Sequence, residues 1–365
     1  MHSTAATRTH ELVLGLSQSR RRDTLTLRHE LIALLRRALP FDAWCWAFAD
    51  PDSQLVSSGT GDSPAAADIG RFLALEYGDD DLDRLLTLAD GAGPAIGVLS
   101  QTTAGDLRRS TRWRELYHPH GVGDELRLAL FADGHCWGYL ELLRDRTGGH
   151  FTTEEAEFLL RLAVPMAKAL RAALTCVSAP TTDVPPGPGT LILDVHNAIQ
   201  ATTPEGDQWL ALLRSYAIPA EALFPAPTPV VSVATGLRSL SACSGAPRTA
   251  APAAARVRTR TPAGHWLTIH ASHLTGMTVP SGTVAVTIQR APPADVAALV
   301  FHAHGLTVRE RQLARLLLDG LPNTEIAQQL HISTYTVRDH VKAVLDKLGV
   351  HSKRELIASI LSQRL

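Results

Sequence analysis

The spacing of apolar residues changes several times along the chain, and each change predicts a different element. Between residues 23 and 39 apolar side chains recur every three or four positions, which is typical of one helix face, and Pro40 ends the pattern. Residues 41–50 (FDAWCWAFAD) then alternate large aromatic side chains with small ones, which predicts a strand. These two patterns open an α+β unit.

The same unit closes with a hairpin and a helix. Residues 125–144 form two apolar runs separated by Asp133-Gly134, a pair typical of a tight hairpin turn. Thr152 and Glu155 have the spacing of a capping box, in which each side chain accepts a hydrogen bond from the other residue's backbone N–H. They precede an apolar stripe with helical spacing, so we expect a helix over 152–174.

A proline- and glycine-rich segment at 175–189 separates this unit from a second one. We expect a strand and turn over 191–199, a short helix from 206, and three strands at 256–261, 265–274 and 282–290. Pro292-Pro293 ends the unit, and a short connecting helix follows over 294–303. The two α+β units share a broad plan.

The last sixty residues predict four helices. Thr307 and Glu310 form a capping box for the first, and Gly320 ends it. The second spans 323–330, and Ser333 is placed as the N-cap of a third that ends at Gly349. In the third helix one stripe is apolar, and the opposite stripe is polar (Tyr335, Arg338, Asp339, Lys342 and Asp346).

Two short helices joined by a tight turn, the second with an exposed cationic face, predict a helix-turn-helix. A helix fits the major groove of DNA, where arginine and lysine reach guanine edges or phosphates. A polar stripe by itself is equally typical of a solvated helix face. The stripe therefore leaves both interpretations open.

Charge is divided unevenly along the chain of 365 residues. The formal net charge is −1, but residues 305–365 hold nine basic and six acidic residues, or +3, which leaves −4 on the rest. Between Asp50 and Asp83 nine acids face only Arg71, so we expect an acidic surface there. This distribution excludes a uniformly basic nucleic-acid-binding protein, but not a basic tip.

Lysine is rare, with only Lys168, Lys342, Lys347 and Lys353. None follows a glycine, which excludes a Walker-type phosphate loop, and a phosphoacceptor receiver domain at the N-terminus is not expected either. The chain lacks an apolar run long enough to cross a membrane and an apolar signal core, so we expect a cytoplasmic protein without membrane attachment.

Residues 306–357 (LTVRERQLARLLLDGLPNTEIAQQLHISTYTVRDHVKAVLDKLGVHSKRELI) resemble the LuxR-type helix-turn-helix module along their whole length. The resemblance implies a recognition helix over 333–348 that reads the major groove. It places Arg338, Asp339 and Lys342 toward the bases. The flanking and phosphate-contacting positions are Ser333, Tyr335, Thr336, His340, Lys347, Lys353, Asn323 and Thr324.

Two residues depart from the LuxR-type pattern. Thr324 stands where the family often has lysine or arginine, and Asp339 brings a carboxylate into a groove lined by phosphates. Asp339 either accepts from a cytosine amine or pairs with Arg338. The sequence does not choose between these two roles.

The remaining units carry weaker resemblances. Residues 23–174 resemble the GAF-type sensory domains attached to this reader in actinobacterial regulators, and residues 188–291 resemble a divergent PAS-type domain. The expected fold is multidomain, with two α+β sensory domains followed by an all-α four-helix domain. The expected segments are a flexible N-terminus (1–22), the GAF-like domain (23–174), a linker (175–187), the PAS-like domain (188–291), a connector helix (292–304) and the reader (305–365).

Sites other than the reader have little support in the sequence. Trp44, Trp46, Trp137 and Tyr139 are candidates for a ligand pocket, although aromatic residues on strands are more typical of a core. The spacing of histidines and cysteines favours no metal site, and no cofactor is expected. Cys45 and Cys136 lie in apolar strands, where inert buried thiols are the rule and redox sensing is the lesser alternative. No catalytic motif is present, so we expect no enzyme.

The sequence therefore predicts a transcription regulator that binds an inverted-repeat operator in double-stranded DNA as a homodimer. The helix at 23–39 and the sensory units would dimerise, while the helices at 152–174 and 294–303 transmit a change caused by a small-molecule ligand of unknown identity or by a partner protein. RNA polymerase is a further candidate partner. Two alternatives are a regulator whose front units are protein-interaction modules that sense no ligand and, with less support, an enzymatic GAF unit.

Overall fold

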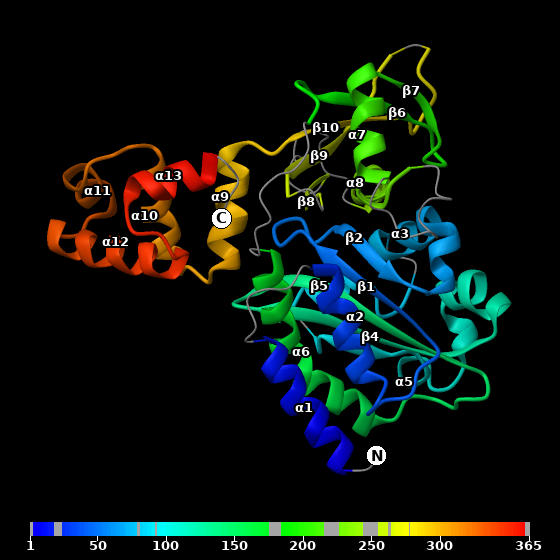
Figure 1. Cartoon of the computed structure of the whole chain (residues 1–365). Coiled ribbons are helices and arrows are strands. Elements are labelled where there is room, and N and C mark those ends of the chain that lie inside the picture. The colour runs from blue at the N-terminus through cyan, green and yellow to red at the C-terminus, as the bar shows by residue number, and fades with distance from the viewer. Residues whose placement is uncertain are drawn as a thin grey trace.

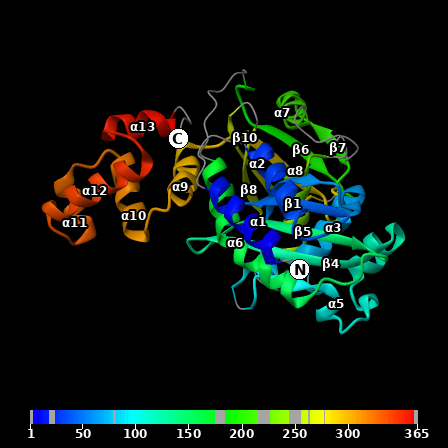
Figure 2. The same cartoon turned by 60° about the horizontal axis from the view of Figure 1, so that its bottom comes forward.

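The computed structural model describes residues 3–17, 24–78, 81–91, 93–174, 184–214, 226–243, 255–261, 264–276 and 278–361. Residues 18–22 of the expected N-terminal segment and residues 175–183 of the expected linker lie outside this part of the chain. The described residues form two sheet-containing units and a helical unit, which Figure 1 and Figure 2 show set apart at one side of the molecule.

The first unit is built on an antiparallel five-stranded sheet with the order β2-β1-β5-β4-β3. Its strands are β1 (Ala43–Ala49), β2 (Val56–Gly61), β3 (Ile96–Val98), β4 (Val122–Ala132) and β5 (His135–Asp145). The predicted hairpin is confirmed: Ala132 pairs with His135, and Asp133 and Gly134 both have positive φ values, of 51° and 78°. Two positive φ values match the strand twist that a two-residue hairpin turn requires.

Helices cover both faces of this sheet. One face carries α2 (Thr24–Leu35) and α6 (Thr153–Leu174). The other face carries the shorter helices η1 (Pro64–Asp68), α3 (Ile69–Tyr77), α4 (Leu85–Ala89), α5 (Leu99–Thr102), η2 (Leu107–Arg109), η3 (Trp113–Tyr117) and η4 (His118–His120). The capping box that opens α6 is present: Thr152 N–H donates to Glu155 Oε2 over 2.9 Å, and Glu155 N–H donates to Thr152 Oγ1 over 3.3 Å.

The alternation in β1 sorts its side chains between these faces. Trp44, Trp46 and Phe48 pack against α2 and α6, while the small residues Cys45 and Ala47 point to the opposite face. Successive side chains of a strand point to opposite faces, so this one strand builds a densely filled core on one side and leaves space on the other.

The N-terminus differs from the expectation of a flexible segment. Residues Ser3–Ser17 form helix α1, which contacts α2 and α6. Thr9 and Val13, four positions apart, are buried against the unit. This short buried stripe is too brief to stand out in the sequence, and burial against α6 stabilises the helix.

The second unit repeats the sheet order of the first. Its strands are β6 (Gly189–Leu193), β7 (Ile199–Thr202), β8 (Arg256–Arg260), β9 (Trp266–His273) and β10 (Val284–Arg290), in the order β7-β6-β10-β9-β8. The expected strands and the short helix, α7 (Pro204–Arg214), are confirmed. Both sheets place their first strand between the second and fifth, which is the common plan that the sequence indicated.

One buried helix in the second unit was absent from the sequence-based prediction. Helix α8 (Thr228–Cys243) lies between the second sheet and the first unit, where it contacts β9, β2 and α3. Its residues from 228 to 237 are buried without interruption. A helix buried on all sides has no amphipathic period, which explains why apolar spacing did not reveal it.

Polar contacts fix the boundary between the two units. Tyr77 of α3 and Ser232 of α8 form a buried hydrogen bond of 2.7 Å between their hydroxyls. Arg258 of β8 donates to both carboxylate oxygens of Asp50 over 2.8 Å, and it also reaches Asp52 over 2.7 Å. Burial alone raises the pKa of Asp50, but the hydrogen bonds and charge of Arg258 hold it below its usual value. The expected acidic surface at 50–83 is therefore partly an internal interface.

A connector helix and four further helices complete the chain. Helix α9 (Pro293–Ala303) is the predicted connector, and α10 (Val308–Leu318), α11 (Asn323–Leu330), α12 (Thr334–Leu348) and α13 (Lys353–Leu361) are the four predicted C-terminal helices. Asp295 at the start of α9 accepts from Arg256 of the second unit over 3.1 Å. At its other end the His302 ring lies 4.0 Å from the His135 ring of the first unit, between centroids. The connector thus touches both sheet units.

His302 is held in its neutral form. Burial lowers the pKa of His302 from 6.5 to about 4, and the charges of His135 and Arg311 add to this shift. Asp52, 3.8 Å from Nε2, opposes it without cancelling it. The His302 Nδ1 atom has no hydrogen-bond partner within the described part of the chain.

We expect the Asp50–Arg258 pair to be a major source of stability at the boundary between the units. Asp50→Asn leaves a buried guanidinium with reduced compensation, so the free energy of unfolding should fall by about 3–5 kcal/mol. Urea unfolding followed by tryptophan fluorescence measures this. The double variant Asp50→Asn, Arg258→Met should recover part of the loss, whereas strictly additive losses would contradict the account.

His302 should make stability depend on pH. The unfolded chain binds a proton at His302 below pH 6.5, while the folded chain resists it down to about pH 4, so stability is fully present above pH 6.5 and declines across this window. The variant His302→Phe keeps an aromatic ring but cannot titrate. Its melting temperature should therefore fall less than that of the unmodified chain between pH 6.5 and 4, and parallel curves would refute this role.

Candidate nucleic-acid interface and ligand cavity

The orientation of α12 is fixed by an N-cap at its start and by the burial of its apolar face. Ser333 accepts a hydrogen bond from the Thr336 N–H over 3.0 Å, as expected of an N-cap. Val337, Val344 and Leu348 are buried against the other helices. The helix is thereby held with its remaining side chains directed outward.

The turn before α12 brings α11 against it. His331 adopts a left-handed conformation with φ of 52° and ends α11, while Ile326 and Leu330 are buried beneath α12. Figure 1 shows α11 and α12 side by side at the far end of the molecule from the sheets. The capping box of α10 is also present, with Thr307 and Glu310 bonded in both directions. This arrangement confirms the helix-turn-helix predicted from the sequence.

The residues expected to face bases are exposed and have no internal partners. Tyr335 is 72% exposed, and Arg338, Asp339 and Lys342 are exposed along the same face. Within the described residues, Arg338 and Lys342 make neither a hydrogen bond nor an ion pair, and Asp339 does not pair with Arg338. Both cations are therefore available to a ligand.

The other expected contact residues lie around this face but differ in exposure and in whether they have internal partners. Lys347 forms an ion pair of 2.6 Å with Glu310, and Lys353 donates to Asn323 Oδ1 over 2.8 Å. Thr324 is exposed, while Thr336 and His340 are half-buried. Internal partners thus hold Lys347 and Lys353, so they position the module as well as carrying charge.

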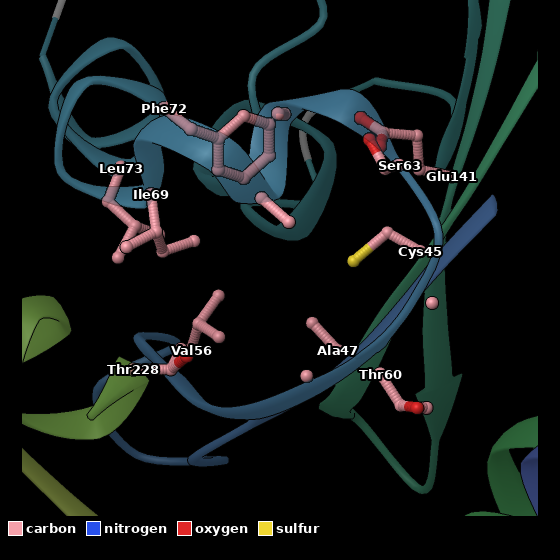
Figure 3. Close-up of a pocket in the computed structure, with 14 residues that line it drawn as sticks. Cys45, Ala47, Val56, Thr60, Ser63, Ile69, Phe72, Leu73, Glu141 and Thr228 are labelled. Carbon is pink, nitrogen blue, oxygen red and sulfur yellow. The ribbon is translucent and has the colours of Figure 1, made fainter. Parts of the chain in front are cut away.

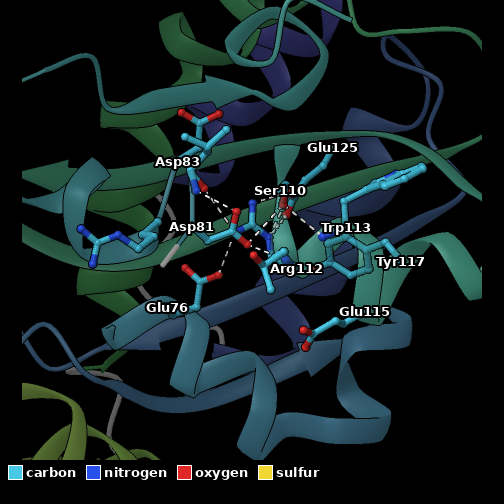
Figure 4. A network of polar contacts seen from close by, with 12 residues as sticks. Glu76, Asp81, Asp83, Ser110, Arg112, Trp113, Glu115, Tyr117 and Glu125 are labelled. Carbon is cyan, nitrogen blue, oxygen red and sulfur yellow. Dashed lines mark hydrogen bonds and ion pairs between the residues drawn. The ribbon is translucent and has the colours of Figure 1, made fainter. Parts of the chain in front are cut away.

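A network of buried charges occupies the first unit beneath α3 and η3 (Figure 4). Arg112 pairs with Glu76, Asp81 and Glu125, and Arg127 pairs with Glu76, Glu125 and Glu141. All six side chains are 5% exposed or less. Two arginines therefore face four carboxyl groups, away from water.

The sequence did not suggest this network, although a signal was present. Glu125 and Arg127 alternate with leucines in β4, a pattern that normally indicates one solvent-exposed face. Here the short helices cover that face. Burial raises the pKa of Glu141, with a further contribution from Glu125, whereas the charges of Arg112 and Arg127 outweigh burial at Glu125 and lower its pKa.

The four aromatic residues proposed from the sequence do not line one common pocket. Trp44, Trp46 and Trp137 are buried in the core beneath α2 and α6, and Tyr139 belongs to the core on the other face of the sheet. A cavity does exist in this unit, on the face opposite the tryptophans, and none of the four lines it. The prediction is therefore corrected: the aromatic residues of β1 are packing residues, and the small residues between them border the cavity.

Cys45 lies at this cavity, and Cys136 is buried. Burial raises the pKa of the Cys136 thiol to about 11, which keeps it protonated and unreactive.

Within the described residues, no helix is long and apolar enough to cross a membrane.

Comparisons with known proteins match the two ends of the chain. The family described as "Bacterial regulatory proteins, luxR family" matches residues 304–360, and the GAF domain family matches residues 23–170. The spore germination protein GerE of Bacillus subtilis (strain 168) is 39% identical over 56 residues, which cover 15% of this chain and 76% of GerE.

Other relatives match over a smaller share of their length. The nitrate/nitrite response regulator protein NarL of Escherichia coli (strain K12) is 40% identical over 60 residues, and the match spans 16% of this chain and 28% of NarL. The crystal structure of Escherichia coli SdiA aligns with 98% of both chains at 12% identity and a TM-score of 0.36.

Proposed function

Because the chain belongs to the luxR family of bacterial regulatory proteins and carries a GAF domain, we propose that it is a cytoplasmic transcription regulator. It binds specific sequences of double-stranded DNA through α12. The observation that carries this proposal is the exposed face of α12, on which Arg338 and Lys342 have no partner within the described residues.

Base recognition is assigned to the centre of this face. The guanidinium of Arg338 can donate two parallel hydrogen bonds to O6 and N7 of a guanine, and Lys342, one turn further along, adds a second donor. Asp339 is exposed between them, and because it makes no ion pair with Arg338, it is free to accept from a cytosine amine.

Phosphate contacts are assigned to the margins of the face. Ser333, Thr336 and Tyr335 stand at the start of α12, and Asn323 and Thr324 at the start of α11, where helix N-termini favour anions. His340, Lys347 and Lys353 complete the set. Lys347 and Lys353 reach phosphates only by sharing or leaving Glu310 and Asn323.

A homodimer suits the modest charge of the reader. One copy of residues 305–365 carries a net charge of +3, and a second copy doubles the phosphate contacts and steepens the dependence on salt. Two readers related by a two-fold axis match an inverted-repeat operator. The exposed surfaces of α1, α2 and α6 are the proposed dimerisation region.

Control is assigned to the two sheet units acting through α9. This helix is bonded to the second unit at Asp295 and packs against the first at His302, and it also contacts α10 and α13. A ligand that favours one arrangement of the units therefore shifts the population of dimers whose readers fit the operator. The PAS-like assignment of the second unit is supported by its sheet order, which equals that of the GAF sheet.

Substitutions on α12 should separate specific from general binding. Arg338→Ala should weaken binding to a selected genomic fragment by about 1–3 kcal/mol and weaken binding to unrelated DNA less. Lys342→Ala should also weaken binding, with a shallower salt dependence where phosphate contacts are lost. Fluorescence anisotropy of labelled duplexes at several salt concentrations measures both effects.

The matched control is Arg108→Ala, which removes an exposed arginine from η2, outside both the reader and the proposed dimerisation region. It should leave DNA affinity unchanged. An equal loss on every DNA sequence would restrict Arg338 to phosphate contact, and an unchanged affinity in both α12 variants would refute the proposed interface.

A further inference from the structure

The cavity in the first unit is formed by small residues on paired strands (Figure 3). Cys45 and Ala47 of β1 pair with Gly61 and Gly59 of β2, and these four small residues border the space from the sheet side. The enclosed cavity has a volume of about 50 Å³, and the empty space reaches about 540 Å³ only when the open solvent at its mouth is included. Val56 of β2 also borders the space from the sheet side, and the opposing wall is apolar and consists of Ala65, Ala66, Ile69, Phe72 and Leu73.

Two oxygen atoms in this apolar setting have no hydrogen-bond partner among the residues that the structure describes. Glu141, which pairs with Cys45 across the sheet, has a side chain that is 5% exposed, and its Oε2 atom accepts no hydrogen bond. The buried Ser63 Oγ likewise has no partner, and Figure 3 shows both groups at one end of the cavity. Buried polar atoms are normally hydrogen-bonded, so these two mark a position for a donor.

The other oxygen of Glu141 is fully engaged. Oε1 accepts from the Tyr117 hydroxyl over 2.5 Å and from Arg127 over 3.0 Å. The carboxyl group is therefore fixed in position, with one oxygen in the charge network and the other left for the cavity. Burial and the neighbouring Glu125 carboxyl group favour the protonated form of Glu141, and a cation at Oε2 would favour the carboxylate instead.

We propose that this cavity binds a small, mostly apolar amine, whose ammonium or amine N–H donates to Glu141 and Ser63. The apolar part of the ligand fills the space between Ala47, Gly59 and Phe72. A carboxylate ligand is disfavoured, because it would face the Glu141 carboxyl group across an apolar cavity. The inference rests on the proposed function, since it names the class of signal that the GAF unit detects.

The position of the cavity explains how occupancy would reach the rest of the chain. Thr228 at the start of α8 lines it, and Ile69, Phe72 and Leu73 belong to α3, which packs against α8. A ligand that fills the space therefore supports α3 and α8 together. Ligand binding would therefore stabilise the contact between the two units.

Matched probes test the ligand class. Hexylamine, 2-phenylethylamine, 2-phenylethanol and 3-phenylpropanoate are titrated against the full-length chain, and the melting temperature is followed. The amines should raise it in a dose-dependent manner, the alcohol should raise it less, and the carboxylate should leave it unchanged. No shift with either amine, or equal shifts with 2-phenylethylamine and 3-phenylpropanoate, would overturn the proposal.

Two variants assign the effect to this cavity. Glu141→Gln keeps the size of the side chain and an acceptor for Tyr117, so it should remove the advantage of 2-phenylethylamine over 2-phenylethanol. Gly59→Val fills the space without a clash, because a Cβ atom at Gly59 meets no atom within 4 Å, and it should abolish both shifts. Amine binding that survives in both variants would refute the site.

DNA binding by the same preparations separates this inference from the proposed function. If the chain binds its selected DNA fragment but no amine, the ligand assignment fails and the regulator remains. If an amine binds as described but no DNA is bound, the cavity assignment stands and the proposed function fails.

Discussion

The burial of α8 is the constraint on which the arrangement of the sheet units depends. Residues 228 to 237 of this helix lie between the second sheet and the first unit, and they are shielded from water on all sides. One hydrophobic core runs through α3, α8 and the second sheet, so α8 is fully buried only because the two units meet there. The Tyr77–Ser232 hydrogen bond and the Asp50–Arg258 ion pair satisfy the polar groups that this burial removes from water. The two units therefore act as one body, and α9 rests on both.

Patterns within one element were sufficient to predict most of the fold. Alternation located the strands, Asp133-Gly134 located the hairpin turn, and side chains such as Ser333 located helix starts, because each of these signals acts over a few residues. The features that were missed depend on residues far apart in the chain. Helix α8 has no polar face, and Asp50 is buried only because Arg258 meets it from 208 positions away.

The candidate sites divide in the same way. The exposure of Arg338 and Lys342 follows from the helical period, so the sequence placed the reader's polar face correctly. The ligand pocket could not be predicted in this way, because the aromatic residues that were its candidates are core residues. The space arises where two strands each contribute small side chains, and that pairing becomes visible only in the folded sheet. The same holds for Glu141, whose unpaired oxygen depends on the charges buried around it.

In the proposed dimer, two copies of α12 read DNA together. Hydroxyl-radical footprinting of the full-length chain on a duplex selected from a genomic fragment library tests it most directly. A dimer should give two protected segments on one face of the duplex, with centres about 10 base pairs or a multiple of that apart and with inverted-repeat sequences. A single protected segment, or even protection along the whole duplex, would contradict it.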